Sequence, residues 1–227
     1  MSNPTDFSLY LLTIRGKLAA AKLEGSRILH NKTAGEPENI AAAQSLGDIS
    51  HLVYVPMDQP KNGSGEFLIM DIWNNSEGLN QFFANPTVQE QAGQIFTSRD
   101  PVVWTPAEGY VSYHIPASFG KNERTLAMVR GKVPSREKAL TIHNAGASKM
   151  INQAHRAGDL SHDAYFRLAP HGTAEALEFL AVDVWSDSAA MQEFYNRPEF
   201  MQTLDGLFSA EPNFSIWTHP AGEWVEW

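Results

Sequence analysis

The sequence predicts an α+β protein built from two tandem units, each with the element order strand, helix, strand, strand, helix, strand (βαββαβ). Two observations support this prediction. The 227-residue chain repeats a set of polar and apolar motifs at an offset of about 110 residues, and strand-like and helix-like patterns follow in the same order within each copy. The paired motifs are Arg15-Gly16-Lys17 and Arg130-Gly131-Lys132, His30-Asn31 and His143-Asn144, residues 47–51 and 158–162, and residues 67–73 and 179–185.

Local patterns define the elements of the first repeat. Alternating apolar residues indicate strands, and stretches rich in Ala, Leu and Lys indicate helices. Gly47 is suited to end a helix, residues 59–65 have the composition of a hairpin loop, and Asn85-Pro86 marks a break inside the last helix. The predicted strands cover 7–17, 51–58, 66–74 and 102–105, and the predicted helices cover 19–32, 38–46 and 76–96.

The second repeat follows the same order after a linker. Gly120 and several polar residues make 111–124 the natural connection, so we expect a first domain over 1–110 and a second over 125–227. The predicted strands of the second repeat cover 125–132, 162–169, 177–185 and 213–218, and its predicted helices cover 135–157 and 188–208.

The nested strand-helix-strand crossovers determine how each unit should fold. This order gives the ferredoxin-like fold, a four-stranded antiparallel sheet with both helices on one face. The other face of such a sheet still needs an apolar partner. We therefore expect two tandem ferredoxin-like units packed sheet-to-sheet, forming an intramolecular dimeric α/β barrel within one chain.

Composition and charge exclude several classes of protein. Lys and Arg number 17 against 26 Asp and Glu, which gives a formal net charge of −9. Because no basic stripe is present to bind phosphates, we expect no nucleic acid and no membrane as partner. The absence of cysteine excludes disulfides and thiolate chemistry. The sequence shows neither a signal peptide nor an apolar stretch of the roughly 18 residues that span a membrane, so we expect a cytoplasmic protein.

The strand over 67–73 contributes candidate site residues, because side chains alternate across a strand. Asp71 and Trp73 share one face of it with two apolar residues, whereas the other face is purely aliphatic. The aliphatic face is the better partner for helices, so we expect Asp71 and Trp73 to point into the barrel. Asp183 and Trp185 stand at the matching positions of the second repeat and predict the same arrangement.

Two arginines are the predicted partners of these carboxylates, because a partly buried carboxylate needs a counter-charge. We expect the first and third strands of each unit to be parallel neighbours, which places Arg15 close to Asp71 and Trp73. The same reasoning places Arg130 close to Asp183. Two interpretations stay open, a structural ion pair and a polar cavity wall that orients a ligand.

Histidine supplies the remaining candidates. His30 and His143 precede an asparagine in both copies, and His51 and His162 open the second strand of each unit. Histidine can move protons near neutral pH. No His-x-x-x-His or Glu-x-x-His spacing is present, so no metal site is predicted. The alternative is that these histidines shape structural corners by bonding the backbone.

The chain resembles the dimeric α+β barrel superfamily, which includes the antibiotic-biosynthesis monooxygenases. The resemblance covers nearly the whole chain in tandem form. It rests on the βαββαβ order, on an Asp-x-Trp pattern at two strand ends and on a Ser-x5-Phe-x3-Pro pattern in two helices. These patterns lie at Asp71/Trp73 and Asp183/Trp185, and at Ser76-Phe82-Pro86 and Ser188-Phe194-Pro198.

The resemblance implies an oxygenase-like enzyme that holds a flat, mostly apolar molecule, such as an aromatic phenol, in the barrel cleft. Arginine would stabilise a developing oxyanion, histidine or asparagine would handle a proton, and tryptophan would stack on the ligand. The alternative is a non-catalytic small-molecule-binding or stress-related accessory protein of the same fold. The predicted catalytic residues are Arg15, His30, Asp71, Arg130, His143 and Asp183, and the predicted ligand-binding residues are Asn31, His51, Trp73, Asn144, His162 and Trp185.

The haem chemistry of some superfamily members does not carry over to this chain. Haem-degrading members place an Asn on the first strand and a His on the second helix, and neither residue is present in the matching segments of either repeat. We therefore predict no cofactor, leaving haem or flavin open, and a cofactor-independent monooxygenase-like reaction if the protein is an enzyme. Because the barrel would be completed within one chain, a homodimer is optional.

Overall fold

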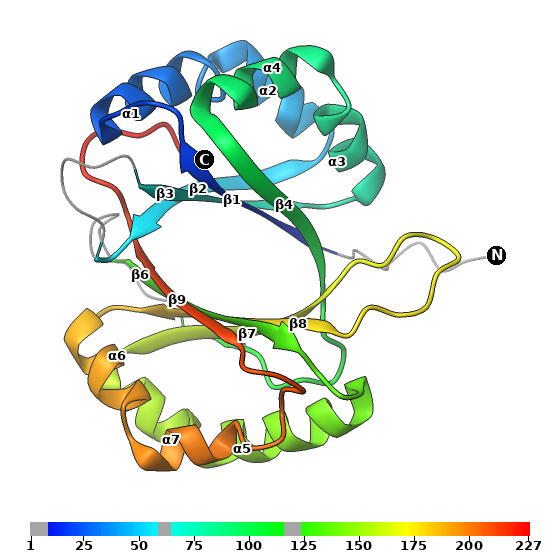
Figure 1. The fold of residues 1–227 in the computed structure, drawn as a ribbon, viewed down its shortest axis with the longest axis vertical. Coiled ribbons are helices and arrows are strands. Elements are labelled where there is room, and N and C mark those ends of the chain that lie inside the picture. The colour runs from blue at the N-terminus through cyan, green and yellow to red at the C-terminus, as the bar shows by residue number, and fades with distance from the viewer. Residues whose placement is uncertain (1–8, 59–64, 116–123) are drawn as a thin grey trace. The chain divides into compact units, whose positions relative to one another are not determined.

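A computed structural model describes residues 9–58, 65–115 and 124–227 of the chain. Contacts divide the chain into two compact units, whose elements are drawn in Figure 1. The first unit consists of Met1–Thr105 together with Pro220–Trp227, and the second unit is Pro106–His219. Each unit has its own strands and the helices that cover them.

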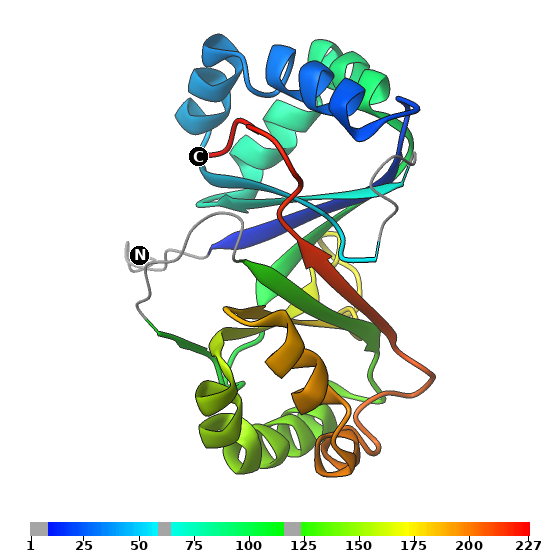
Figure 2. The same ribbon diagram turned by 90° about the vertical axis from the view of Figure 1, so that its left-hand side faces the viewer.

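The first unit follows the βαββαβ order, with both helical segments divided in two. Its strands are arranged in the order β4-β1-β3-β2, and its helices lie together on one face of these strands (Figures 1 and 2). Its elements are β1 (Tyr10–Leu18), α1 (Leu23–Lys32), α2 (Pro37–Ser45), β2 (Asp48–Pro56), β3 (Glu66–Trp73), α3 (Ser76–Phe83), α4 (Pro86–Ile95) and β4 (Phe96–Pro106).

The second unit repeats this arrangement with a longer first helix and one short additional strand. Its strands are arranged in the order β9-β6-β8-β7-β5. The predicted α+β class with ferredoxin-like units is thereby confirmed, whereas the sheet-to-sheet barrel stays a prediction. Its elements are β5 (Tyr113–His114), β6 (Thr125–Lys132), α5 (Arg136–Ala157), β7 (Asp159–Arg167), β8 (Glu178–Trp185), α6 (Ser188–Tyr195), α7 (Pro198–Thr203) and β9 (Asn213–Thr218).

Proline divides the second helical segment of each unit. The predicted helix over 76–96 is two helices, because Pro86 has no backbone N–H to continue α3 and instead opens α4. The side chain of Asn85 caps α4 by accepting a hydrogen bond from the Thr87 N–H at 2.9 Å. Pro198 opens α7 in the same way. None of the described helices combines the length and the apolar character needed to cross a membrane.

The compact units do not coincide with the ranges 1–110, 111–124 and 125–227 predicted from the repeat. Residues 106–115, which were assigned to the end of the first domain and to the linker, pack in the second unit and contain β5. The part of the predicted linker at 116–123 lies outside the described residues. Residues 220–227 pack in the first unit (Figures 1 and 2). Each unit therefore contains the segment that follows the last strand of the other repeat.

The first and third strands of each repeat are antiparallel, not parallel as the sequence analysis supposed. In the first unit, Leu12 pairs with Asp71 and Arg15 pairs with Leu68. The physical reason is that a crossover makes the first two strands parallel, and a hairpin then makes the third strand antiparallel to both. Residues that pair directly share a face, so Arg15 lies on the opposite face from Asp71.

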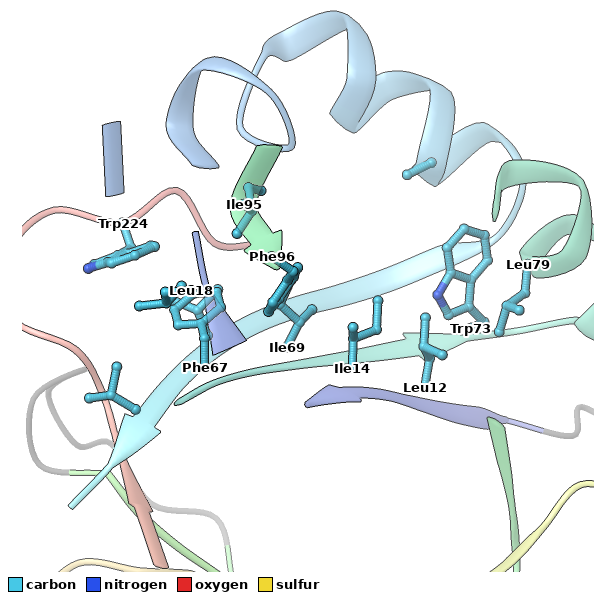
Figure 3. Packing of buried hydrophobic residues seen from close by; sticks show 13 residues of the cluster. Leu12, Ile14, Leu18, Phe67, Ile69, Trp73, Leu79, Ile95, Phe96 and Trp224 are labelled. Atoms are coloured by element: carbon cyan, nitrogen blue, oxygen red, sulfur yellow. The ribbon is translucent and has the colours of Figure 1, made fainter. Parts of the chain in front are cut away.

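The predicted orientation of the third strand was also wrong. Phe67, Ile69 and Trp73 point toward the helices, where they pack with Leu79 and Ile95 (Figure 3). The layer between a sheet and its helices is about 10 Å thick, and large aromatic side chains fill it better than aliphatic ones. In the second unit, Phe179 and Trp185 are likewise fully buried in clusters that include helix residues.

Replacing Gly47 by alanine should destabilise the protein by about 1–3 kcal/mol. Gly47 has a φ of +107°, and a Cβ there would lie 2.1 Å from Asn74 Oδ1. Gly93 in α4 is the matched control, because a Cβ there meets nothing within 4 Å and alanine should stabilise the helix by up to about 1 kcal/mol. Urea unfolding of both variants measures the difference in their free energies of unfolding. Equal values would show that position 47 tolerates a side chain.

Candidate functional site

A chain of hydrogen bonds crosses the interior of the first unit. His30 on α1 places Nε2 at 2.9 Å from Nε2 of His51 on β2, and Nδ1 of His51 lies 2.7 Å from Oδ1 of Asp71 on β3. The strand register produces the second contact, because His51 pairs directly with Asp71. Nδ1 of His30 meets Oδ1 of Asn31 at 3.1 Å. The side chains of His30, His51 and Asp71 are all buried.

The partners of Asn31 determine where the protons lie. Its side-chain N–H donates to the carbonyl of Glu223 at 2.8 Å, and its Oδ1 accepts from the N–H of Val225 at 3.1 Å. His30 must therefore donate through Nδ1 to Oδ1 of Asn31 and accept through Nε2. His51 then donates from both ring nitrogens, to His30 and to Asp71. This assignment makes His30 the neutral ring and His51 the charged ring.

The pKa shifts agree with this pattern. Burial and the neighbouring His51 lower the pKa of His30 to about 4. Burial opposes the charge of His51 as well, but the adjacent carboxylate of Asp71 outweighs it and raises the pKa of His51. One positive and one negative charge are thus paired inside the unit, next to a neutral imidazole.

The second unit contains the same chain. Nε2 of His143 lies 2.9 Å from Nε2 of His162, Nδ1 of His143 lies 3.1 Å from Oδ1 of Asn144, and His162 bonds Oδ1 of Asp183. Burial and His162 lower the pKa of His143 to about 4, and the pKa of His162 is raised by Asp183 against the effect of burial. The two units therefore share one electrostatic design, which we call the His–His–Asp chain.

A second carboxyl group lies beside each His–His–Asp chain. Asp48 opens β2, and a bulge between Asp48 and Ser50 brings it to the same face as His51. Burial and the charge of Asp71 raise the pKa of Asp48 to about 7. Asp159 opens β7 in the same way, and burial and the charge of Asp183 raise its pKa to about 8. Carboxyl groups with such values can take or give a proton near neutral pH.

Each unit has a small, mostly apolar cavity between its strands and helices. The first cavity has a volume of ≈ 70 Å³ and is lined by Asp48, His51 and Asp71 together with apolar residues of α2 and α4. The second has a volume of ≈ 90 Å³, and its wall includes Asp159 and Asp183. A dry cavity of about 150 Å³ holds one benzene ring. Both cavities therefore have to widen to admit an aromatic molecule.

The segment following each repeat closes the cavity of the unit in which it packs. Residues 106–113 and 220–227 share the pattern Pro-Ala-x-x-aromatic-Val-x-aromatic, and we call them the exchanged tails. Asn144 holds the first tail as Asn31 holds the second, since its side chain donates to the carbonyl of Gly109 at 2.8 Å and accepts from the N–H of Val111 at 2.9 Å. The backbone contacts do not depend on the identity of the aromatic residues.

The last aromatic residue of each exchanged tail stacks on the charged histidine. Trp227 lies on His51 with ring centroids 4.4 Å apart and planes 15° apart. Tyr113 lies on His162 with centroids 5.7 Å apart and planes 28° apart, and its hydroxyl donates to Oδ2 of Asp159. The other oxygen of Asp159, Oδ1, is buried and has no hydrogen-bond partner within the described part of the chain.

The two cavities also differ at the last residue of the helix that follows the third strand of each repeat, α3 in the first unit and α6 in the second. Tyr195 on α6 accepts a hydrogen bond from Nε1 of Trp185 at 3.0 Å and donates to Oδ2 of Asp183 at 2.5 Å. The matching residue of the first unit is Phe83, which has no polar atom. Nε1 of Trp73 correspondingly has no partner among the described residues.

The structure brings the predicted histidines, asparagines and aspartates together but not the arginines. Arg15 pairs with Glu66 at 2.6 Å, and Arg130 pairs with Glu178 at 2.6 Å. The predicted pairs of Arg15 with Asp71 and of Arg130 with Asp183 were wrong, because each arginine lies on the opposite sheet face and the carboxylate already binds a histidine.

The tryptophans differ in their relation to the cavities. Trp73 and Trp185 are both fully buried, and Trp185 forms part of the second cavity wall. Asp48 and Asp159 were not among the predicted site residues, although both lie inside the repeated motif Gly-Asp-x-Ser-His at 47–51 and 158–162. The exchanged tails were not predicted either, because their common pattern is short and lies beyond the predicted last strands.

Comparisons with known proteins identify the fold. No family model and no curated protein matches the chain. An anthrone oxidase-like protein of known structure is 17% identical, with 96% of this chain and 95% of that chain covered and a TM-score of 0.65. A monooxygenase-like protein from Listeria innocua is 12% identical, covers 98% and 100% and has a TM-score of 0.52.

A ferredoxin-fold protein from Listeria monocytogenes, related to antibiotic biosynthesis monooxygenases, is 9% identical, with coverages of 97% and 100% and a TM-score of 0.50. At these identities the similarity establishes the fold and not the reaction. The predicted resemblance to monooxygenase-like ferredoxin-fold proteins is confirmed at this level.

The Asp159→Asn variant should gain stability relative to the natural protein as the pH rises from 5 to 8. The raised pKa of about 8 means that folded Asp159 keeps its proton in a range where the unfolded carboxyl has lost it. That contribution to stability is complete below pH 4 and is lost as the pH rises toward 8, so the difference should grow by roughly 1.4 kcal/mol per pH unit.

Urea unfolding at several pH values measures this difference. The exposed Asp205 serves as the control, since Asp205→Asn should leave a difference that does not change with pH. A constant difference for Asp159→Asn as well would show that Asp159 is already ionised in the folded protein at pH 5.

Proposed function

We propose that the protein is a cofactor-independent, monooxygenase-like enzyme acting on a flat, mostly apolar phenolic molecule. One observation carries the proposal, an apolar cavity that contains a buried carboxyl group with a pKa near neutrality beside a charged His–Asp pair. Such a group is suited to remove a proton from a weak acid in the absence of water. The fold shared with monooxygenase-like proteins supports the same class of reaction.

The first step is removal of the phenolic proton by the carboxylate of the cavity, Asp48 or Asp159. A phenol has a pKa of about 10, so a base with a pKa of 7 to 8 accepts its proton far more readily than an ordinary aspartate does. The charged histidine, His51 or His162, lies in the same wall and favours the resulting phenolate. The apolar remainder of the wall holds the ring and excludes water.

Molecular oxygen then serves as the only oxidant. The electron-rich phenolate reduces O2, a C–O bond forms at the ring carbon para to the phenolate oxygen, and the carboxyl returns the phenolic proton to the peroxide, which gives a hydroperoxide. The carboxylate then removes the hydrogen on that carbon as a proton, the O–O bond breaks to give a quinone, and the carboxyl passes this second proton to the departing hydroxide to form water. The substrate supplies four electrons, and one O2 provides the new quinone oxygen and the oxygen of the water.

Substrate entry requires the second cavity to widen from ≈ 90 Å³. Its wall includes Met150, an adaptable side chain, and Phe200 on α7. This helix has only six residues, none of them buried, and its Phe200 packs against Phe194 and Tyr195 of α6. We infer that the ring enters beside α7.

Non-catalytic binding of the same class of molecule is the second candidate function. It is favoured by the first unit, where Trp227 covers His51 and the cavity is only ≈ 70 Å³. A binding protein would hold a phenol without consuming oxygen. Oxygen uptake therefore separates the two candidates directly.

The test is oxygen uptake with 1-naphthol, 1,8-dihydroxynaphthalene and anthrone as probes. The double variant Asp48→Asn/Asp159→Asn should lower kcat by about 100-fold or more, because it removes the base from both cavities without changing their size. The control is Arg15→Lys/Arg130→Lys, which preserves charge on the opposite sheet face and should turn over normally.

Three results are decisive. Full activity of the folded aspartate double variant would exclude these carboxyls as the base. Equal losses in the arginine variant would restore the sequence-based assignment of the arginines. Quenching of tryptophan fluorescence by the phenols without any oxygen uptake would identify a binding protein.

A further inference from the structure

We propose that only the cavity of the second unit is reactive, and that Tyr195 and Tyr113 are the positioning residues that make it so. This inference rests on the proposed function, because it assigns that function to one of two cavities built on the same His–His–Asp chain. It is carried by two positions at which the cavities differ in hydrogen-bonding chemistry.

Tyr195 fixes the role of Asp183. The tyrosine hydroxyl donates to Oδ2 of Asp183 at 2.5 Å, and His162 bonds Oδ1 of the same carboxylate. Both oxygens of Asp183 thus accept hydrogen bonds, which an ionised carboxylate does best. Asp183 is thereby kept as the permanent counter-ion of His162, and Asp159 remains as the proton-accepting carboxyl of this cavity.

Tyr113 fixes the orientation of Asp159. Its hydroxyl donates to Oδ2 of Asp159, which leaves Oδ1 as the oxygen that is available to accept a proton. That oxygen is buried and has no partner within the described residues, and Asp159 belongs to the cavity wall. The phenolic donor also favours the ionised form of Asp159, which offsets part of the effect of burial on its pKa.

The first cavity lacks both tyrosines. Phe83 stands where Tyr195 does, so it cannot donate a hydrogen bond to Asp71. Trp227 stands where Tyr113 does and stacks on His51 with ring centroids 4.4 Å apart. Its indole N–H favours the ionised form of Asp48, but Nε1 has no hydrogen-bond partner within the described residues. The His–His–Asp chain is intact, but in the described part of the protein the wall of this cavity has no tyrosine hydroxyl that holds Asp71 as the counter-ion and leaves Asp48 as the proton acceptor.

The two exchanged tails allow a matched comparison of Tyr113 with Trp227. Asn31 and Asn144 hold the backbones of the two tails by equivalent bonds. Tyr113 and Trp227 therefore reach their histidines along the same path, and the side chain alone distinguishes them. Replacing each by phenylalanine keeps an aromatic ring at the end of the tail and removes its polar group.

The experiment measures oxygen uptake with 1-naphthol, 1,8-dihydroxynaphthalene and anthrone across pH for Tyr113→Phe, Tyr195→Phe and their first-cavity counterpart Trp227→Phe, with Arg15→Lys/Arg130→Lys as the control. The two tyrosine variants should lose about tenfold or more in kcat/KM, Trp227→Phe should lose less than either, and the control should stay within about twofold of the natural protein. In Tyr113→Phe the acid limb of the pH profile should also move to higher pH, because Asp159 loses a donor that favours its ionised form. A merely structural role would lower activity without moving that limb.

The outcomes separate this inference from the proposed function. Full activity and an unchanged pH profile in both tyrosine variants, with an inactive Asp48→Asn/Asp159→Asn variant, would overturn the inference and leave the function standing. An equal loss in Trp227→Phe and Tyr113→Phe would show that both cavities react. Thermal unfolding verifies that each variant folds, and should Tyr195→Phe not fold, Tyr113→Phe still decides through its pH profile.

Discussion

The contact between two imidazoles, Nε2 to Nε2 at 2.9 Å in each unit, is the constraint on which the other features of the site depend. Two ring nitrogens at this distance share one proton, so one histidine must be neutral and the other must donate. Because the other nitrogen of the donor also donates, to the aspartate, the donor is charged inside the protein and is paired with an ionised carboxylate. With that carboxylate charged, the second carboxyl nearby is driven to hold its proton longer. Together with burial, this contact accounts for the directions of three pKa shifts in each unit, those of the two histidines and of the second carboxyl group.

The same contact joins parts of the chain that are distant in sequence. His30 or His143 belongs to the first helix, its partner histidine to the second strand, and the aspartate to the third. The neighbouring asparagine extends the chain to an exchanged tail that belongs to the other repeat. Because a buried polar group costs free energy unless all its bonds are made, the helix, the two strands and the tail have to take their places together. The identity of the tail's aromatic residue is left free by this requirement, so it can differ between the two cavities.

The sequence was sufficient for the order of elements and for most members of the candidate site, but not for its internal contacts. Repeated motifs indicated His30, Asn31, His51 and Asp71 as candidates, and alternation showed which residues share a strand face. Alternation does not show which face the helices cover, and here the aromatic face of β3 fills the space beneath them. Arg15 was the natural partner for Asp71 only on the assumption of parallel strands, and antiparallel pairing moves it to the other side of the sheet. Asp48 and Asp159 escaped notice because a bulge, which no periodicity reveals, turns them toward the histidines.

The two units together distinguish the contacts that hold each unit together from the contacts that are suited to acid–base chemistry. The first unit keeps the whole His–His–Asp chain around a cavity of ≈ 70 Å³ that lacks both phenols. The chain of hydrogen bonds therefore suffices to hold a unit together, and its presence alone does not imply a reaction. What the second unit adds is a pair of hydroxyls, one from α6 and one from an exchanged tail, each bound to a different carboxyl. These two bonds assign unlike tasks to two like groups, a fixed counter-ion and a proton acceptor, and unlike tasks for paired carboxyls are what acid–base chemistry requires.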